Sequence, residues 1–410
     1  MKFLVLTQYY PPEVGAPQVR LAALVGELVR DGHQVQVVTA LPNHPEGRIQ
    51  DGYRRRLAAR EQMGGADVRR VWMYAATGAG SRRLVSYLSF CATSMTALVR
   101  CQRPDVLFVE SPPLFLGLTA VVMSAVWRRP IVFNVADLWP DSAVEMGMLK
   151  PGRVLAVVEW FERAVYRRSR WVNAVTEGIR DVLVKDKGVP LEKVTFLPNG
   201  VDIDLFHDGE PTADVTDLVG PGPAFLYAGT VGLAQGLDVG LDAMAIVRLR
   251  YPQATLLLLG GGSDRERLEA RVQAERIDGV RFLDPVPPER VAEIYRGCVA
   301  GFASLKNLPI FDGARPSKIF PIMASARPVL YSGRGEGARL VGDNGAGIVC
   351  APEDAESLAT AMITLLEDPA EARRMGANGR LLVEREFSWG PLVRDWLGQL
   401  TPGLTSRPTR

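Results

Sequence analysis

Short apolar runs alternate with amphipathic stretches through the first 200 residues of the chain. KFLVLTQ, near the start, has the continuous apolar character of a buried strand, and apolar residues spaced three and four apart predict a helix over residues 18–30. Further strands are predicted in GHQVQVVTA, VRRVWMYA, DVLFVESPP, PIVFNVAD, WVNAVT and VTFLPNG, with helical runs mostly between them. This alternation indicates a parallel sheet covered by helices on both faces.

The same pattern starts again after residue 222. Strands are predicted in AFLYAGTVG, ATLLLLGGG, VRFLDPV, AGFASL and RPVLYSG, each followed by a loop and a helical run. Between the two halves, residues 201–222 are rich in Gly, Pro and Asp and have little periodicity, which is typical of a linker. We therefore expect an N-terminal domain over 1–200 and a C-terminal domain over 223–385. Both would be doubly wound, with ligands bound outside the carboxyl ends of their strands.

Composition narrows the class of protein. The chain has 410 residues, of which 47% are hydrophobic and 23% charged, as in globular proteins with ordered cores. We find no apolar run of the roughly 18 residues that a membrane helix needs, and the N-terminal apolar run is too short for a signal peptide, so we expect a cytoplasmic protein. The four cysteines form no CxxC pair and the three histidines are scattered, so no metal, disulfide framework or cofactor is expected.

Glycine-rich loops follow several strands of the second half. They are GTVGLAQG (229–236), GGGSD (260–264) and DGARPSK (312–318). Glycine lets a backbone approach a ligand closely, and a helix opened by Ser317 as N-cap beside Lys318 would attract an anion. The chain has no GxGxxG after its first strand and no P-loop motif. We interpret the three loops together as a site for a phosphorylated ligand such as a nucleotide, although each loop alone is also explained as a tight turn.

Five ordered segments carry a resemblance to a known family. DLWPDSAVEMGML, FLPNGVD, YAGTVGLAQGLD, LLLLGGGSDRERLE and RPSKIFPIMASARPVLYSG resemble glycosyltransferase family 4, in its bacterial branch of fucosamine- and colanic-acid-type polysaccharide transferases. The resemblance implies a GT-B fold, in which two doubly wound Rossmann-like domains face each other across a cleft. It also implies a nucleotide-sugar donor in the C-terminal domain, an acceptor in the N-terminal domain, retention of anomeric configuration, and a last helix (386–410) that crosses back to the first domain.

The chain departs from the family where cations and carboxylates are expected. The family's G-R-x-x-x-x-K-G pattern grips the donor diphosphate with Arg and Lys, but the matching positions here include Gly229, Thr230, Gln235 and Gly236. The family's two glutamates, eight residues apart, fall on Gly313 and Pro321. We expect other groups of the C-terminal domain to hold the diphosphate. The expected donor-binding residues are Gly15, Asn199, Gly229, Thr230, Gln235, Gly261, Leu283, Lys306, Arg315, Ser317 and Lys318.

The reasons for expecting these residues to bind the donor differ. Gly15 resembles the family glycine that lets the first loop approach the sugar, and the backbone around Leu283 is the expected contact of the nucleobase. Lys306, Arg315 and Lys318 are the cations that could replace the missing pair. The alternative is a plain helix cap with solvated Lys318 and Arg315, and Asn199 is equally explained as part of a turn with Gly200.

Asp137 is the expected catalytic residue, because it ends the predicted strand IVFNVAD and the resemblance places it beside the sugar and acceptor. A carboxylate there could accept a proton from the acceptor or stabilise positive charge on the sugar. It could instead only bind substrate, or only cap the turn DLWPDS. His44, in NHPEG, is expected by the resemblance to lie on the acceptor side.

The net charge of +2 is unevenly distributed, with a basic front half and an acidic back half. Basic clusters at 54–56, 81–90 and 163–170 suggest contact of the N-terminal domain with the anionic inner face of the cell membrane, which suits a polyprenyl-diphosphate-linked glycan as acceptor. Exposed helix faces explain them equally well, and no module for nucleic-acid binding is present. Two alternatives to a UDP-sugar-dependent transferase stay open: a GT-B sugar-nucleotide epimerase and a non-catalytic sugar-nucleotide-binding protein.

Overall fold

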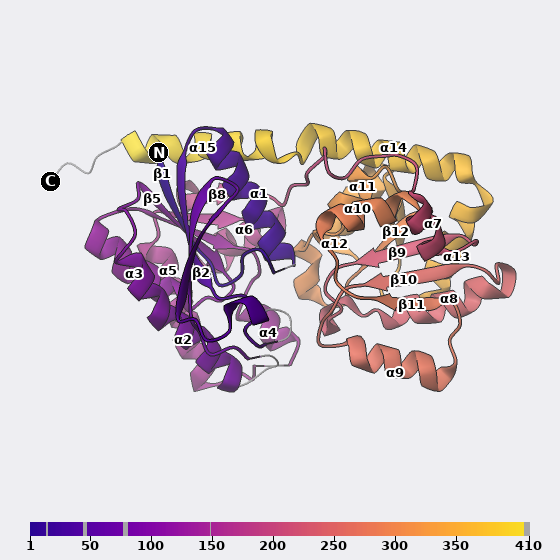
Figure 1. Cartoon of the computed structure of the whole chain (residues 1–410), viewed down its shortest axis with the longest axis horizontal. Helices are drawn as coiled ribbons and strands as arrows, with labels where there is room; N and C mark the ends of the chain where they lie inside the picture. Colours follow the sequence, from indigo (N-terminus) through magenta and orange to yellow (C-terminus); the bar gives the residue numbers. More distant parts are fainter. Residues whose placement is uncertain (14, 44–46, 77–80, 148, 406–410) are drawn as a thin grey trace. The chain divides into compact units, whose positions relative to one another are not determined.

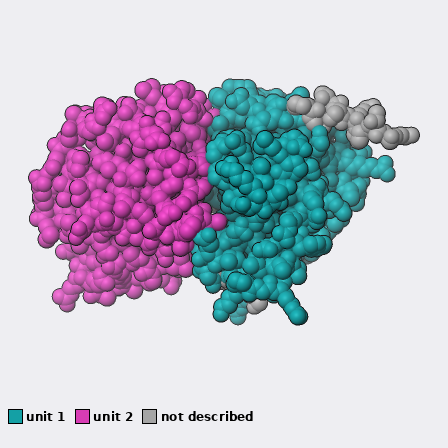
Figure 2. Space-filling model, turned by 180° about the vertical axis from the view of Figure 1, so that it is seen from behind, with its two compact units in different colours: residues 1–198, 389–410 teal, residues 199–388 magenta. Residues whose placement is uncertain are grey.

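The computed structural model describes residues 1–13, 15–43, 47–76, 81–147 and 149–405, and the chain divides into two compact units (Figures 1 and 2). Unit 1 contains residues 1–198 and the segment from 389 onward, and unit 2 contains residues 199–388. The last helix, α15 (Trp389–Thr405), therefore belongs to the same unit as the N-terminus.

Unit 1 is built on an eight-stranded sheet with the order β3-β4-β2-β1-β5-β6-β7-β8. Every neighbouring pair is parallel except β3 and β4. Its strands are β1 (Lys2–Leu6), β2 (Gln34–Ala40), β3 (Ala58–Met63), β4 (Ala66–Val71), β5 (Val106–Ser111), β6 (Ile131–Val135), β7 (Trp171–Ala174) and β8 (Val194–Phe196). Its helices before α15 are α1 (Ala16–Arg30), α2 (Ser81–Leu98), α3 (Leu116–Trp127), α4 (Asp141–Glu145), α5 (Arg153–Arg168) and α6 (Glu177–Lys185), with short 3₁₀ turns η1 (Asp51–Tyr53) and η2 (Leu191–Lys193).

The central strands of unit 1 are largely apolar because they lie in its core. Every residue of β5 is buried, as expected where helices cover both faces of a parallel sheet. The indole of Trp396, on α15, is fully buried with its ring centre 5.7 Å from that of Phe108 on β5. Burying so large an aromatic side chain fixes the final helix to this unit.

A ladder of polar side chains crosses the same sheet. The Asn134 amide donates to Glu110 Oε2 at 2.9 Å, the Asn173 amide donates to Asn134 Oδ1 at 2.7 Å, and Thr195 Oγ1 donates to Asn173 Oδ1 at 2.9 Å. These residues face one another in register on β5 to β8 and are all buried, and Arg20 of α1 pairs with Glu110. The ladder therefore ties α1 to four strands, because each of these buried side chains forms a hydrogen bond with the next.

Unit 2 is built on a six-stranded parallel sheet with the order β11-β10-β9-β12-β13-β14. Its strands are β9 (Ala224–Ala228), β10 (Thr255–Leu259), β11 (Val280–Leu283), β12 (Ala300–Ser304), β13 (Val329–Ser332) and β14 (Gly347–Cys350). Its helices are α7 (Ala213–Val219), α8 (Asp238–Arg250), α9 (Arg265–Glu275), α10 (Pro288–Arg296), α11 (Ile319–Ala324), α12 (Gly335–Asp343), α13 (Ala355–Glu367) and α14 (Pro369–Glu386), with 3₁₀ turns η3 (Leu233–Gln235) and η4 (Pro309–Gly313). This is the doubly wound order in which ligands bind where the strand order reverses, here between β9 and β12.

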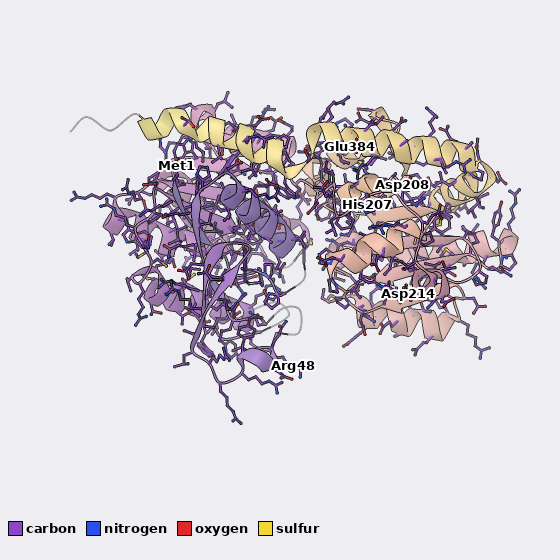
Figure 3. The ribbon with its side chains drawn as sticks, turned by 45° about the horizontal axis from the view of Figure 1, so that its top comes forward. Met1, Arg48, His207, Asp208, Asp214 and Glu384 are labelled. Carbon is purple, nitrogen blue, oxygen red and sulfur yellow. The ribbon has the colours of Figure 1, made fainter. Side chains whose placement is uncertain are left out.

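Residues 201–222, which the sequence suggested as a linker, are part of unit 2. Val201, Phe206, Val215 and Val219 are buried in its core, and Asp214 lies within α7 of this segment. His207 and Asp208, labelled in Figure 3, bond with arginines of the unit: Arg296 lies 2.8 Å from His207 Nε2, and Arg327 donates to Asp208 Oδ1 at 3.2 Å. The apolar residues are irregularly spaced, and this explains why periodicity did not reveal the packing.

Among the residues that the structure describes, no helix combines the length and apolar character needed to cross a bilayer.

Candidate functional site

The candidate site lies at the carboxyl edge of the unit 2 sheet, where the loops after β9, β10 and β12 meet. The β9 loop contacts the β10 loop through backbone atoms: Gly229 N–H donates to the Leu259 carbonyl and Val231 N–H to the Gly261 carbonyl, both at 2.9 Å. A Cβ built on Gly260, which has φ +138°, would lie 1.9 Å from the Gly229 carbonyl oxygen. Glycine is therefore required there by close approach of the two loops, and Gly229 and Thr230 remain exposed above them.

The β12 strand and its loop hold the second part of the β9 loop. Ser304 Oγ donates to the Gln235 carbonyl at 2.7 Å, and Lys306 N–H donates to the Ala234 carbonyl at 3.0 Å. Gly236, with φ +57°, lies against the Lys306 side chain. Three of the expected loops thus form one continuous edge, as the sequence predicted from their glycines.

Lys318 provides a cation at this edge. Its Nζ lies 5.0 Å from the centre of the buried Tyr227 ring, and its side chain passes so close to Gly229 that a Cβ there would lie 2.9 Å from Lys318 Cε. Burial lowers the pKa of Lys318 to about 8. Within the described part of the chain Lys318 has no carboxylate partner, so its charge is available to an anion bound beside Gly229 and Thr230.

Arg315 has a different environment from Lys318. Its Nε lies 2.9 Å from Glu336 Oε1 and its guanidinium carbon 5.5 Å from the centre of the Phe387 ring, and both charged side chains are largely buried. Arg315 was expected as a donor-binding cation, but its charge is already compensated inside the protein. We therefore regard it as a residue that fixes the loop.

Ser317 is not the N-cap of the following helix. α11 begins at Ile319 with Lys318 at the N-cap position, and no side chain caps it. The turn before the helix is closed by the Ile319 N–H, which donates to the Pro316 carbonyl at 3.2 Å. Pro321 then occupies the first turn of a helix of only six residues, so the sequence rule placed the cap one residue too early.

The Leu283 carbonyl, near the expected nucleobase contact, accepts hydrogen bonds within the protein. Gly260 N–H donates to it at 3.0 Å and the Arg265 guanidinium at 3.3 Å. Asn199, another expected donor-binding residue, is half-buried and is the first residue of unit 2.

Two arginine contacts that sequence reasoning missed connect the β12 loop to the start of α12. Besides the Arg315–Glu336 pair, Arg334 forms a two-pronged ion pair with Asp312 and donates to Asn307 Oδ1 at 3.0 Å. Arg334 and Glu336 follow RPVLYSG, a segment used for its predicted strand and its resemblance, and the sequence interpretation did not consider them. These contacts hold the backbone that carries Lys318. Of the expected cations they leave Lys318 and Lys306 for direct contact with an anion, and Lys318 is the one that lies against the exposed Gly229.

Asp137 is exposed and lies in the loop after β6, at the carboxyl edge of the unit 1 sheet. Ser142 Oγ donates to Asp137 Oδ2 at 3.1 Å. Partial removal of water from the carboxylate by the surrounding protein raises the pKa of Asp137 above its ordinary value, while the Ser142 hydrogen bond acts in the opposite direction. Lys187 fixes the adjacent helix α4, because its Nζ lies 2.8 Å from Asp141 and 3.0 Å from the buried Glu162.

Gly15 is the N-cap residue of α1, on the same sheet edge as Asp137. Its φ of 171° is extended, and a Cβ there would lie 2.6 Å from Oε1 of Gln18. Gln18 is buried, so a larger residue than glycine would have to displace it. His44, the expected acceptor-side residue, lies outside the described residues.

Among the described residues, no cluster of three or more His, Cys, Asp or Glu side chains has the arrangement to hold a metal ion.

Comparison with known proteins identifies both halves of the chain. Residues 15–200 match the family model described as glycosyl transferase 4-like domain, and residues 213–382 match that of glycosyl transferases group 1. WcaI of Escherichia coli, which is named as a colanic acid biosynthesis glycosyl transferase, is 27% identical over 69% of this chain and 71% of its own. A glycogen synthase of Mycobacterium tuberculosis is 25% identical over 95% of this chain and 92% of its own.

Solved structures agree on the fold. Sucrose-phosphate synthase from Thermosynechococcus elongatus superimposes with a TM-score of 0.76 at 21% identity and covers 98% of both chains. The HepE protein of Anabaena in complex with UDP-glucose has a TM-score of 0.72 at 17% identity, over 98% of this chain and all of its own. Each unit is doubly wound, and the two matching family models together span most of the chain. With the relatives above, these matches show that the chain belongs to the family 4 glycosyltransferases, which have the GT-B fold.

Proposed function

We propose that this glycosyltransferase transfers a hexose or N-acetylhexosamine-type sugar from a nucleoside diphosphate, with a UDP-sugar as the favoured donor, to a glycan or lipid-linked acceptor. The transfer would retain the anomeric configuration and serve the synthesis of cell-surface polysaccharide. The similarity to WcaI, which is named for colanic acid biosynthesis, supports a role in polysaccharide synthesis. The similarity to a protein solved in complex with UDP-glucose supports a UDP-sugar as the donor. We propose that the enzyme acts in the cytoplasm.

The observation that carries the donor site is the position of Lys318 at the point where the strand order of unit 2 reverses. Tyr227, at the end of β9, lies beneath the Lys318 ammonium, and Gly229 and Thr230 are exposed next to it. A diphosphate bound there would meet one cation and backbone from a loop without side-chain bulk. The family's Arg and Lys are absent from the β9 loop, and we propose that Lys318 provides the charge in their place.

The chemistry follows from the charge that develops during transfer. When the bond between the anomeric carbon and the phosphate oxygen breaks, negative charge grows on the leaving diphosphate, and a fixed cation beside it lowers the energy of the transition state. The acceptor oxygen forms the new bond to the same carbon and loses its proton. We propose that ionised Asp137 orients the acceptor hydroxyl, with the donor phosphate as the group that takes the proton.

Calorimetric titration with UDP tests the donor site. We expect Lys318→Ala to bind UDP about tenfold or more weakly than the unaltered protein, because a charge-assisted contact contributes roughly 1.5–3 kcal/mol. Lys185→Ala is the matched control, since Lys185 lies in unit 1 and pairs with Asp181. Unchanged affinity in Lys318→Ala would remove Lys318 from the site, and no binding of UDP, GDP or ADP to the unaltered protein would overturn the donor proposal.

An activity measurement separates an enzyme from a protein that only binds the nucleotide. We expect purified protein to release free sugar slowly from its preferred donor, because water can replace the acceptor. Binding without any release of sugar over long incubation would favour the non-catalytic alternative. Conversion of the sugar to its epimer would favour the epimerase.

A further inference from the structure

Helix α3 of unit 1 exposes an apolar stripe that nothing in the described structure covers. The helix contains no charged residue, yet Leu118, Val122 and Val126 are exposed, with 54% of Leu118 and 68% of Val126 accessible to solvent. These residues are spaced four apart and therefore lie on one side of the helix. The exposed side of an ordinary surface helix is polar.

The two neighbouring helices continue the stripe. α3 packs against α2 and against α5, and all three lie on the same side of the unit 1 sheet (Figure 1). α2 exposes Leu84, Val85 and Leu88, and α5 exposes Val154, Val157 and Trp160. Trp160 is 61% accessible, although a tryptophan is normally among the best-buried side chains. Together the exposed apolar residues of the three helices form what we call the α2–α3–α5 face.

Positive charge surrounds this face. The three helices contain six arginines and two glutamates in the sequence, and one of these acids, Glu162, is buried and bonded to Lys187 and Tyr166. Arg82, Arg83, Arg153, Arg163 and Arg167 are all exposed. An apolar face with an exposed tryptophan, on helices that also expose arginines, is suited to a surface that is anionic outside and apolar just beneath, as an anionic bilayer is.

The face adjoins the sheet edge that carries Asp137. α2 and α3 both begin at that edge, and Tyr87 of α2 lines a small pocket with Phe115 and with Trp139, two residues after Asp137. Phe115 in turn stacks on Phe161 of α5, with 6.0 Å between the ring centres. A bilayer on the face would therefore lie close to the loop where an acceptor hydroxyl has to arrive.

We propose that the α2–α3–α5 face docks on an anionic lipid bilayer and presents the Asp137 loop to an acceptor whose lipid part stays in the membrane. This inference rests on the proposed function for the lipid-linked acceptor, but not on the donor site. A second copy of the chain fits the face less well than lipid does, because symmetric pairing would place its arginines opposite one another. Trp160 and Val157 would enter the interface between headgroups and acyl chains, and the arginines would contact the headgroups.

Vesicle flotation with the full-length protein tests the docking. The vesicles are pure phosphatidylcholine in one series and an equal mixture of phosphatidylcholine and phosphatidylglycerol in the other, at low and high salt. We expect at least about tenfold stronger partition onto the anionic vesicles at low salt, because several arginines each contribute near the surface. In the double variant Val157→Glu/Trp160→Glu we expect partition onto the anionic vesicles to be weaker by at least about tenfold, since two side chains that enter the interface become charged.

Leu249→Glu is the matched control, because Leu249 is 86% exposed on α8 of unit 2 and lies outside the face. We expect it to float like the unaltered protein. Titration of both variants with UDP, which is expected to be unchanged, shows that they are folded and separates this proposal from the donor site. Equal flotation of the double variant, or no flotation of the unaltered protein, would overturn the docking. So would a concentration-dependent dimer in analytical ultracentrifugation that the double variant abolishes.

Discussion

The ammonium nitrogen of Lys318 lies 5.0 Å from the centre of the Tyr227 ring, at the end of the central strand β9. Tyr227 is buried and donates its hydroxyl proton to the Thr230 carbonyl, so the ring is fixed by the same loop that the diphosphate would contact. The interaction holds a cation at the place where the strand order reverses. A lysine in this environment differs from a solvated one, because its charge costs energy to maintain.

The donor affinity is expected to depend on pH through Lys318. Burial lowers the pKa of Lys318 to about 8, so the free protein carries this charge below pH 8 and loses it as the pH rises. The affinity for UDP should be nearly constant from about pH 7 to 8 and fall above pH 8 by up to tenfold per unit, roughly as one linked proton requires. Calorimetry in buffers from about pH 7 to 10 measures the decline.

The matched variant for this experiment is Lys318→Arg. Arginine stays charged throughout the range, so the affinity of this variant should not decline above pH 8. A decline of the same size in both proteins would assign the titrating group to another residue.

The Arg315–Glu336 pair is expected to support stability more than donor binding. Both side chains are largely buried, and removal of one partner leaves the other charge uncompensated. Arg315→Met and Glu336→Gln should each lower the free energy of unfolding by about 3 kcal/mol, and the double variant should lose less than the sum. Denaturant unfolding measures these values. Single variants that keep their stability and lose UDP affinity would instead make Arg315 a donor-binding residue.

The polar ladder of unit 1 is expected to depend on its middle member. Asn134 donates to Glu110 and accepts from Asn173, so Asn134→Ala removes one hydrogen bond from each of these two buried side chains. We expect a loss of about 3 kcal/mol in the free energy of unfolding, against about 1 kcal/mol for Thr195→Val, which removes only the terminal donor. Equal losses in urea unfolding would show that the ladder does not act as a connected network.

Asp137 is expected to affect transfer and leave donor binding unchanged. Asp137→Asn removes the carboxylate and should lower the rate of sugar transfer about 100-fold or more, with the UDP affinity unaltered. Ser142→Ala serves as a finer test, because the Ser142 hydroxyl lowers the pKa of Asp137. The acidic limb of its pH–rate profile should move to higher pH. An Asp137→Asn enzyme with full activity would restrict Asp137 to a structural role in its loop.

The sequence predicted the alternation of strands and helices because most positions of each central strand are apolar and each helix has an apolar side. It also predicted that three glycine loops of unit 2 lie at one edge, since close approach at Gly260 has a local signature. It did not predict that residues 201–222 pack into unit 2, because Val201 and Phe206 have no regular spacing.

The charge partners could not be predicted from local pattern. Glu336 compensates Arg315 from a different loop, and no rule of spacing connects residues 21 positions apart on separate elements. The polar ladder left a weak signal, because Asn134 and Asn173 interrupt otherwise apolar strands. Their pairing required the register of the sheet, and that register exists only in the fold.

The crystal structure of the protein with UDP would test the donor site most directly. We expect the diphosphate at the carboxyl edge of unit 2, in contact with the loop of Gly229 and Thr230, with Lys318 Nζ within about 3–4 Å of a phosphate oxygen. A diphosphate bound at another edge of the sheet, or one in this position that Lys318 does not approach, would contradict the assignment of Lys318 as the cation that replaces the family's missing pair.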